Sequence, residues 1–433
     1  MQFEFETPSM TAEILAAQTP EALDPILARL TQSTAPLGAP DVRGHKLFVK
    51  GLDGTIPHIA RTLRLADCEG EKSNDNVCVI ATQLYGVGGH SKVVADITRL
   101  IGGDKVSLIL TDLYGNIPYR RLIGEDLAAR GYHCRALLAL KAPNVLDRTV
   151  ELYRLLCAVK PTRIFLLHHH MDVCAVAATY PFRDVTEFVH HADHLPSLGA
   201  TVDYSAHVDL TYTCHPICAA AGLNPTYSGM TLPDVSIVQG VSKAEGPMVF
   251  GTCGNIGKYR REGRASRYRW VDWVIPALST PNSRFIHIGP TDAAFEQEVR
   301  QGLADAGLDP QRYVFTGATP NLQAALISHQ VDVYVSSYPE GGGRATLEAM
   351  AAGVPAVAPS EAEMGPLVQY SSPLSGWTLV YDPAELPAAI ADAADRRDAM
   401  RSAPYRATVQ AELERFEHYV AGRALGPTPI VQA

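Results

Sequence analysis

One stretch, residues 331–360, constrains the fold more than any other part of the chain. It opens with the apolar run 331–335, which is typical of a buried strand. Pro339 and the three glycines that follow end this strand and open a loop. Residues 344–352, RATLEAMAA, favour a helix that ends at Gly353, and the apolar run 354–358 predicts a further buried strand. The stretch therefore predicts a strand–loop–helix–strand unit of a parallel α/β sheet.

The loop of this unit lies where a parallel sheet places its ligands, between the carboxyl end of a strand and the start of a helix. Unpaired N–H groups at a helix start are partly positive, so they suit a phosphate or sugar oxygen. Glu340 precedes the loop and Glu348 lies about one helical turn beyond the helix start, so both carboxylates can face one ligand. A tight turn with a surface glutamate is the alternative interpretation of such a loop.

The composition of the whole chain excludes several classes of protein. Its 433 residues suit two or three domains, and a net charge of −9 gives no general footprint for nucleic acid. The eight cysteines form no CxxC pair, which indicates scattered core thiols in a reducing compartment. No apolar stretch approaches the roughly 18 residues of a membrane span, and the acidic start lacks the features of a signal peptide. We therefore expect a cytoplasmic protein.

Alternating strand and helix patterns predict the domain organisation. We expect an N-terminal extension of unknown role at 1–75, a first Rossmann-like domain at 76–240, a second at 241–395, and a C-terminal helix and tail at 396–433. The extension is predicted to contain two helices within 10–31, and it is interpreted as a lid, an acceptor-binding module or an oligomerisation element. Turn-rich residues 225–246 are the expected hinge. The predicted strands are 77–84, 106–111, 132–140, 163–167, 186–190, 208–213, 248–252, 284–288, 313–316, 331–335, 354–358 and 377–381, with helices at 125–131, 145–160, 216–222 and 321–327 among them.

The sequence EGGGRATLEAMAAGVP, which starts at Glu340, resembles the E-x7-E signature of the retaining family 4 glycosyltransferases of the GT-B class. The resemblance implies two Rossmann-like domains that face each other across a cleft, a terminal helix that returns to the first domain, and a nucleoside-diphosphate sugar as donor without a metal ion. Gly342 replaces the usual aromatic residue, and Arg344 replaces the usual aliphatic one. Arg344 adds a cation that binds donor phosphate, acceptor or a neighbouring carboxylate.

The same resemblance implies roles for the residues of this segment. Glu340 and the amides of the glycine loop hold the sugar, and Glu348 holds the ribose hydroxyls. The remaining expected donor contacts of the segment are Gly341, Gly342, Gly343, Arg344, Ala345 and Thr346.

A basic loop follows the first strand of the predicted second domain, with the sequence FGTCGNIGK at 250–258. In the resembling family, cations placed here neutralise the donor diphosphate, which gains negative charge as the glycosidic bond breaks. Lys258 is the best candidate, and Arg260, Arg261 and Arg264 are weaker ones. The alternatives for the arginine cluster are a solvated helix face or a peripheral membrane contact with anionic lipid. Gly251, Asn255 and Arg261 complete the expected donor contacts of this loop.

Two further loops resemble donor-binding segments of the family. The strand and loop at 313–317 match the segment that contacts the nucleobase, so Thr316 and Gly317 are expected there. In the first domain, Gly88, Gly89 and His90 match the glycine loop that lies near the donor pyrophosphate and sugar. An ordinary strand–helix turn is the alternative for this loop.

Histidines cluster at 168–170, close to Asp172, and again at 190–194. Adjacent side chains of a strand point in alternating directions, so three consecutive histidines make a poor cage for one metal ion. We predict no metal site. The resemblance implies that a histidine of the second cluster contacts the donor sugar, and His191 is our candidate. The other candidates are His190, Asp193 and His194, of which Asp193 could orient a histidine or act on the acceptor hydroxyl.

The sequence contains no G-x-S-x-G, P-loop, HExxH or G-x-G-x-x-G motif, which argues against a hydrolase with a serine nucleophile, a P-loop enzyme and a dinucleotide oxidoreductase. We interpret the chain as a metal-independent hexosyltransferase that uses a UDP-sugar and retains the anomeric configuration. The acceptor (glycan, lipid-linked glycan, protein or small molecule) and the oligomeric state stay open. One alternative is an inverting protein glycosyltransferase, because residues 250–258, with the Trp-containing helix and TPNS that follow, more weakly resemble the second domain of O-GlcNAc transferase and related bacterial enzymes. The others are a sugar-nucleotide 2-epimerase and a non-catalytic sugar-nucleotide-binding subunit.

Overall fold

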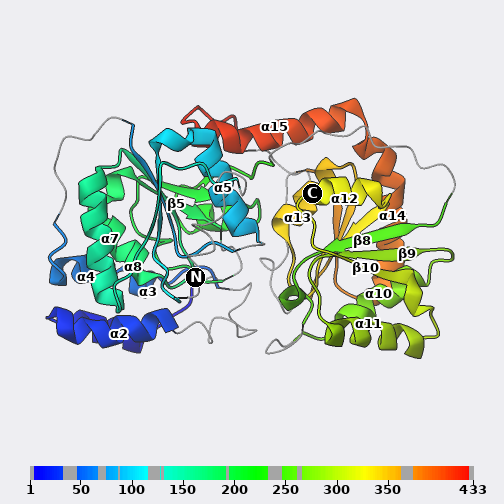
Figure 1. Cartoon of the computed structure of the whole chain (residues 1–433), viewed down its shortest axis with the longest axis horizontal. Coiled ribbons are helices and arrows are strands. Elements are labelled where there is room, and N and C mark those ends of the chain that lie inside the picture. The colour runs from blue at the N-terminus through cyan, green and yellow to red at the C-terminus, as the bar shows by residue number, and fades with distance from the viewer. Residues whose placement is uncertain are drawn as a thin grey trace. The chain divides into compact units, whose positions relative to one another are not determined.

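The computed structural model describes residues 4–32, 46–66, 75–85, 88–115, 127, 131–191, 195–232, 246–260, 266–361 and 374–428. Its contacts divide the chain into two compact units (Figure 1). The first unit consists of Met1–Gly229 with Phe416–Gly426, and the second consists of Met230–Arg415 with Pro427–Ala433.

A parallel sheet of seven strands forms the centre of the first unit, in the order β3-β2-β1-β4-β5-β6-β7. The strands are nearly continuous apolar runs, which is typical of parallel strands covered on both faces. They are β1 Val77–Ala81, β2 Val106–Leu110, β3 Ala136–Ala139, β4 Arg163–Leu167, β5 Thr186–His190, β6 Ala206–Asp209 and β7 Thr226–Tyr227. The α-helices between them are α5 Gly89–Ile101, α7 Val145–Val159, α8 Val173–Thr179 and α9 Cys214–Ala220, with 3₁₀ turns η2 Gly103–Lys105 and η3 Tyr180–Val185.

The N-terminal helices share a hydrophobic core with the first sheet's helices. They are α1 Pro8–Ala16, α2 Pro20–Gln32, α3 Lys50–Asp53 and α4 Ile56–Thr62. Buried Leu27 and Ile59 belong to the same cluster as Val173 and Val176 of α8. The buried carboxylate of Asp53 accepts hydrogen bonds from the backbone of Gly199 and Thr201. The expected pair of helices within 10–31 is confirmed, and this segment is an integral part of the first unit's core.

Phe416–Gly426, a segment of the C-terminal tail, also belongs to the first unit. The guanidinium of Arg163 on β4 donates to the carbonyl of Tyr419, at 3.1 Å, and pairs with Glu187 of β5 at 2.5 Å. The rings of Phe165 and Tyr419 lie 5.9 Å apart, edge to face. The tail is therefore anchored to β4 and β5 by both charge and aromatic packing.

The second unit contains a parallel sheet of six strands, in the order β10-β9-β8-β11-β12-β13. Its strands are β8 Val249–Cys253, β9 Arg284–Ile288, β10 Tyr313–Gly317, β11 Val333–Val335, β12 Ala356–Pro359 and β13 Trp377–Val380. Its helices are α10 Trp270–Leu278, α11 Ala293–Asp305, α12 Leu322–Ser328, α13 Gly343–Ala351 and α14 Leu386–Met400, with 3₁₀ turns η4 Ile256–Lys258, η5 Pro310–Arg312 and η7 Pro383–Glu385. Helix α15, Ala403–Val420, begins in the second unit, and its residues from Phe416 onward belong to the first.

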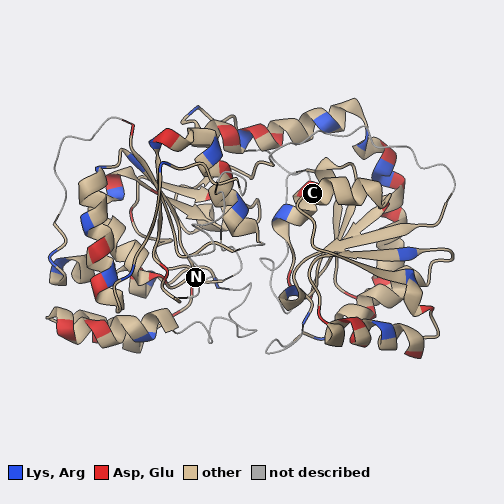
Figure 2. Cartoon of the chain, viewed as in Figure 1, with Lys and Arg blue, Asp and Glu red and all other residues tan. Residues whose placement is uncertain are grey.

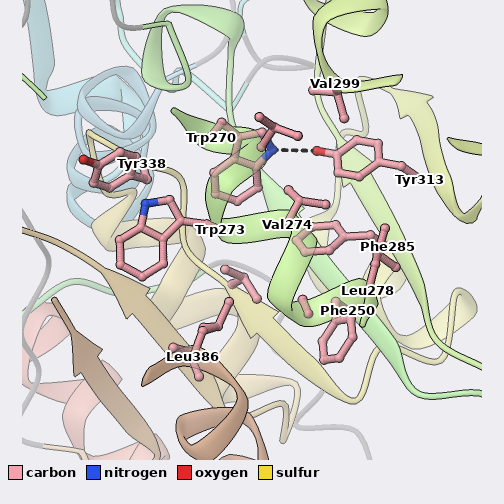
Figure 3. Close-up of a cluster of buried hydrophobic side chains, with 14 of the residues drawn as sticks. Phe250, Trp270, Trp273, Val274, Leu278, Phe285, Val299, Tyr313, Tyr338 and Leu386 are labelled. Atoms are coloured by element: carbon pink, nitrogen blue, oxygen red, sulfur yellow. Dashed lines mark hydrogen bonds between the residues drawn. The ribbon is translucent and has the colours of Figure 1, made fainter. Parts of the chain in front are cut away.

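Large aromatic residues fill one side of this second sheet (Figure 3). Trp270 and Trp273 of α10 are fully buried with Phe285 and Tyr313. The indole Nε1 of Trp270 donates to the hydroxyl of Tyr313 at 2.9 Å (Figure 3). This bond pairs the buried indole N–H of Trp270 with the buried hydroxyl of Tyr313.

The fold confirms the predicted α/β class with two Rossmann-like sheets. The predicted strand 208–213 is wrong at its carboxyl end, because Thr211, Tyr212 and Thr213 turn into α9. The predicted helix 125–131 and most of the predicted hinge lie outside the described residues. Basic and acidic residues both occur along helices of the two units (Figure 2), which is typical of mixed, solvated helix faces.

Candidate functional site

Two loops meet at the carboxyl edge of the second sheet, where β8 and β11 end. The ammonium of Lys258, in η4 after β8, donates to the carbonyl of Gly341 at 2.7 Å. The backbone N–H of Glu340, after β11, donates to the carbonyl of Lys258 at 3.4 Å. The hydroxyl of Ser337 also donates to the carbonyl of Glu340, at 2.7 Å. The structure thus places Lys258 beside Glu340 and the glycine loop, although Lys258 and Gly341 are 83 positions apart in the sequence.

Gly342 lies where the two loops approach each other closely. A Cβ atom at this position would lie 3.3 Å from Nζ of Lys258 and 3.4 Å from Cβ of Ala345. Its φ of −117° is open to any residue. Close approach of Lys258, rather than an unusual backbone conformation, therefore accounts for glycine here.

Helix α13 begins at Gly343, after the N-cap Gly342, and carries Arg344, Ala345, Thr346 and Glu348. Nε of Arg344 lies 3.4 Å from Oε1 of Glu348, one turn along the helix, and their side chains are only 6% and 16% exposed. Of the three partners considered for Arg344, the neighbouring carboxylate is the one it contacts here. Arg344 compensates the charge of Glu348 in a poorly solvated place.

Neighbouring strand ends present a second group of expected donor-binding residues. Exposed Thr316 donates through its hydroxyl to the carbonyl of His287, at 3.1 Å. Gly317 has a left-handed φ of +74°, and its carbonyl accepts from the N–H of Gly289 at 2.8 Å. Asn255 is exposed just after β8. Asn255 follows β8, and Thr316 and Gly317 are the last residues of β10, so they share the carboxyl edge with Lys258.

Gly251 and Arg260, two of the residues expected to bind the donor, have other surroundings. Gly251 is buried inside β8, and a Cβ there would lie 2.9 Å from Cγ1 of Val331, so its glycine serves strand packing. Arg260 pairs with Asp292 in a partly exposed contact. Arg261 and Arg264 lie outside the described residues.

A histidine cluster occupies the carboxyl edge of the first sheet. It consists of His90 on α5, His169 after β4 and His191 after β5. The ring of His90 lies 4.4 Å from that of His191 and 5.4 Å from that of His169. Gly88 is the N-cap of α5 and Gly89 its first residue, so the predicted glycine loop positions His90. Sequence reasoning missed Tyr85, whose hydroxyl lies 3.1 Å from Nε2 of His169.

The imidazoles of this cluster are held neutral. Burial lowers the pKa of His90 to about 4 and that of His169 to about 3, and burial also lowers the pKa of His191 well below its ordinary value. His90 donates from Nε2 to the carbonyl of Leu167 at 2.9 Å, and His191 donates from Nε2 to that of His168 at 2.8 Å. A neutral imidazole that donates from Nε2 keeps an acceptor at Nδ1, which suits a hydroxyl group.

His190 points away from this cluster, as alternation along β5 requires. Its Nδ1 lies 3.2 Å from Oδ1 of buried Asp209, the last residue of β6. Asp172, which the sequence placed beside the first histidine cluster, caps α8 and accepts from the hydroxyl of Thr82 at 2.6 Å. Asp193 and His194 lie outside the described residues.

Within the described residues, one group has the geometry to hold a metal ion: His190, Asp209, Cys214 and Cys218. All four are buried, and their potential ligand atoms lie within 4.8 Å of one another. The histidines of the carboxyl-edge cluster are not part of this group.

No helix among the described residues is both long and apolar enough to span a membrane.

Comparisons with known proteins bear on both units. Residues 251–396 match the family described as Glycosyl transferases group 1. No curated protein sequence matches the chain.

Several solved structures share the fold at low identity. Anabaena Alr3699/HepE, in complex with UDP and glucose, is 13% identical, with a TM-score of 0.57 over 81% of this chain and 99% of that chain. A glycosyltransferase from Rickettsia africae ESF-5 is 10% identical, with a TM-score of 0.55 over 81% and 98%. The apo form of the lipopolysaccharide outer core galactosyltransferase WaaB is 15% identical, with a TM-score of 0.53 over 80% and 98%.

Proposed function

We propose that this chain is a glycosyltransferase with a nucleoside-diphosphate sugar as donor. The proposal starts from the GT-B fold that the chain shares with those proteins. The observation that carries the proposal is the contact between Lys258 and the glycine loop before α13, within the segment that matches the family. UDP-sugar is the proposed donor, since the HepE structures contain UDP or UDP-glucose.

Lys258 would act on the leaving group. When the bond between the sugar and the diphosphate breaks, negative charge grows on the diphosphate. A fixed ammonium stabilises this charge more in the transition state than in the ground state, so it lowers the barrier. The hydrogen bond to Gly341 positions Nζ at the loop before any ligand arrives.

Glu340, Glu348 and the start of α13 would bind the two ends of the donor. Backbone N–H groups at a helix start favour an anionic or hydroxyl oxygen. A carboxylate accepts two hydrogen bonds from a vicinal diol, which suits Glu348 to a ribose. Arg344 would hold the carboxylate of Glu348 in place. Thr316, Gly317 and Asn255 are proposed to contact the nucleobase.

In the first unit, His191 is the proposed catalytic contact of the sugar, and His90 supports it through ring packing. His190 is withdrawn toward Asp209, so we no longer propose it for the sugar. Asp193 and His194 stay candidates. The acceptor remains any of the classes named above.

The first test is binding of UDP, GDP, ADP and their sugars, measured as a shift of the melting temperature. A ligand that binds only the folded state at 100 times its Kd stabilises it by about 2.7 kcal/mol. We expect the largest shift with UDP and UDP-sugars. No shift with any nucleotide contradicts the donor site, and binding without transfer or donor hydrolysis favours the non-catalytic alternative.

Product analysis then tests the reaction type. The E-x7-E carboxylates lead us to propose retention, so the anomeric proton and carbon signals of the product should show the donor's configuration. An inverted product would support the alternative that resembles O-GlcNAc transferase. Isomerisation of the donor sugar without an acceptor would support the 2-epimerase.

A further inference from the structure

We infer that His190, Asp209, Cys214 and Cys218 form a structural zinc site in the first unit, independent of the proposed transferase reaction. His190 ends β5, Asp209 ends β6, and the two cysteines lie one turn apart on α9. Two thiolates, one imidazole and one carboxylate form a ligand set that zinc takes in proteins. The site therefore joins two neighbouring strands and the helix that follows them.

Five of the six distances between the four ligand atoms are close to the edges of a zinc tetrahedron, and all six are within 4.8 Å. The two Sγ atoms lie 3.8 Å apart, and Nδ1 of His190 lies 3.3 Å from Sγ of Cys214 and 3.6 Å from Sγ of Cys218. Oδ1 of Asp209 lies 3.2 Å from Nδ1 of His190 and 3.4 Å from Sγ of Cys218. Ordinary zinc–ligand bond lengths in a regular tetrahedron give edges of about 3.8 Å for S–S, about 3.6 Å for S–N and S–O, and about 3.4 Å for N–O.

Hydrogen bonding alone does not account for this arrangement. One ring nitrogen, Nδ1 of His190, faces both sulfurs and the carboxylate, yet it carries at most one hydrogen. Among the described residues, Nε2 of His190 has no hydrogen-bond partner, and Oδ2 of Asp209 has only a long contact of 3.7 Å with Nδ1 of His215. Burying a polar atom without a hydrogen-bond partner costs free energy. A cation bound by all four groups would offset this cost.

A nucleophilic cysteine is a poorer explanation. In a Cys–His–Asp relay the histidine uses one nitrogen for the acid and the other for the thiol. Here Nδ1 of His190 faces both. All four side chains are also at most 1% exposed, so no substrate can reach the sulfurs. Full burial with four ligands is the mark of a structural site, because a catalytic zinc keeps an open position.

A second layer of contacts surrounds the four ligands. Nε2 of His207 lies 3.2 Å from Oδ1 of Asp209, and its Nδ1 lies 3.1 Å from the carbonyl of Ala200. Partners of this kind fix the orientation of ligating side chains. Since His191 directly follows His190, the zinc site would also fix the end of β5, and with it the carboxyl-edge histidine cluster.

Metal analysis of the full chain tests the inference. Protein purified under reducing conditions without chelator is expected to carry about one zinc ion per chain by inductively coupled plasma mass spectrometry. The double variant Cys214→Ser/Cys218→Ser should lose it, while Cys157→Ser, a cysteine outside the group, should keep it. Stoichiometric zinc that survives in the double variant overturns the site, and a different stoichiometric metal overturns its assignment to zinc.

If the double variant does not fold, cobalt substitution of the wild-type chain tests the zinc site instead. The reduced wild-type chain, stripped of metal and loaded with Co²⁺, should bind about one ion and show the thiolate-to-cobalt charge-transfer band of a tetrahedral sulfur-ligated centre. Adding Zn²⁺ should remove the band, since zinc prefers this ligand set. A reduced, folded chain that takes up neither Zn²⁺ nor Co²⁺ stoichiometrically, or that binds cobalt without this band, overturns the inference.

Discussion

Lys258 is the single side chain whose loss should separate donor binding from folding. Charge-assisted hydrogen bonds are worth about 1.5–3 kcal/mol, so Lys258→Ala should weaken UDP binding roughly tenfold to a hundredfold. The ammonium also donates to the carbonyl of Gly341, so its removal should cost no more than about 1.5–3 kcal/mol of stability and leave the chain folded. Isothermal titration with UDP measures the first effect and thermal melting the second. Lys141→Ala, an exposed lysine of the first unit, is the control. Equal UDP affinity in both variants would contradict the assigned role.

Gly342 allows a subtler test of the same contact. In Gly342→Ala the new Cβ would lie 3.3 Å from Nζ of Lys258, which sits at the end of a flexible side chain and can move away. We expect a stability loss below about 1 kcal/mol, together with weaker UDP binding because the ammonium is displaced. Gly426→Ala is the matched control, since an added Cβ there meets nothing within 4 Å. Unchanged UDP affinity in Gly342→Ala would show that the position of Nζ does not matter.

At the scale of elements, the buried histidines at the carboxyl edge of the first sheet should make the free energy of unfolding fall at acid pH. His90 and His169 have pKa values of about 4 and 3 when folded, below the ordinary value near 6.5. Their contribution to stability is therefore present above pH 6.5 and is lost as the pH falls toward 4, because the unfolded chain binds the protons. Near pH 5 each histidine should cost about 1–2 kcal/mol relative to neutral pH.

The variant His90→Gln isolates one of these contributions. It removes one titrating group, so the loss of stability between neutral pH and about pH 5 should shrink by about 1–2 kcal/mol. His133→Gln, a histidine of the same unit outside the cluster, serves as the control. Denaturant unfolding at both pH values measures the difference. Identical pH profiles for wild type and His90→Gln would show that His90 is solvated well enough to titrate normally.

Strands and helices were predictable because their signals are local. Apolar runs such as 163–167 and 284–288 correspond to β4 and β9 residue for residue. The glycine loop and α13 were placed within one residue, since Gly353 and Pro355 mark the helix end. Strand 208–213 was misjudged because Tyr212 and Thr213 have high strand propensity, yet they turn into α9.

The side-chain contacts of the candidate sites were predictable only in part. The contact of Lys258 with the loop at 341 follows from two strand ends that share one edge, so the strand pattern pointed to it. The pairing of Arg344 with Glu348 fits their i,i+4 spacing, but spacing alone does not select between a carboxylate and a ligand. The convergence of His190, Asp209, Cys214 and Cys218 depends on side-chain direction across β5, β6 and α9, which no residue pattern encodes.

At the scale of the whole molecule, the first unit is built from two segments that lie far apart in the sequence. The first sheet begins at residue 77, but the unit that contains it is completed by Phe416–Gly426. Phe416 is fully buried, and its ring lies 6.3 Å from that of Tyr419, which packs edge to face on Phe165 of β4. A segment that lies far along the chain therefore completes the unit built around the N-terminal sheet.

This connectivity predicts which unit a tail substitution weakens. Phe416→Ala removes a buried aromatic ring and should cost about 3–5 kcal/mol, and amide hydrogen exchange should accelerate in β4 and β5 of the first unit more than in β8 and β9 of the second. Phe295→Ala, which truncates a buried ring of α11 in the second unit's core, should give the opposite pattern. The two variants remove the same side chain, so any difference in pattern reflects location alone. Faster exchange confined to β8 and β9 in Phe416→Ala would mean that the tail stabilises the second unit instead.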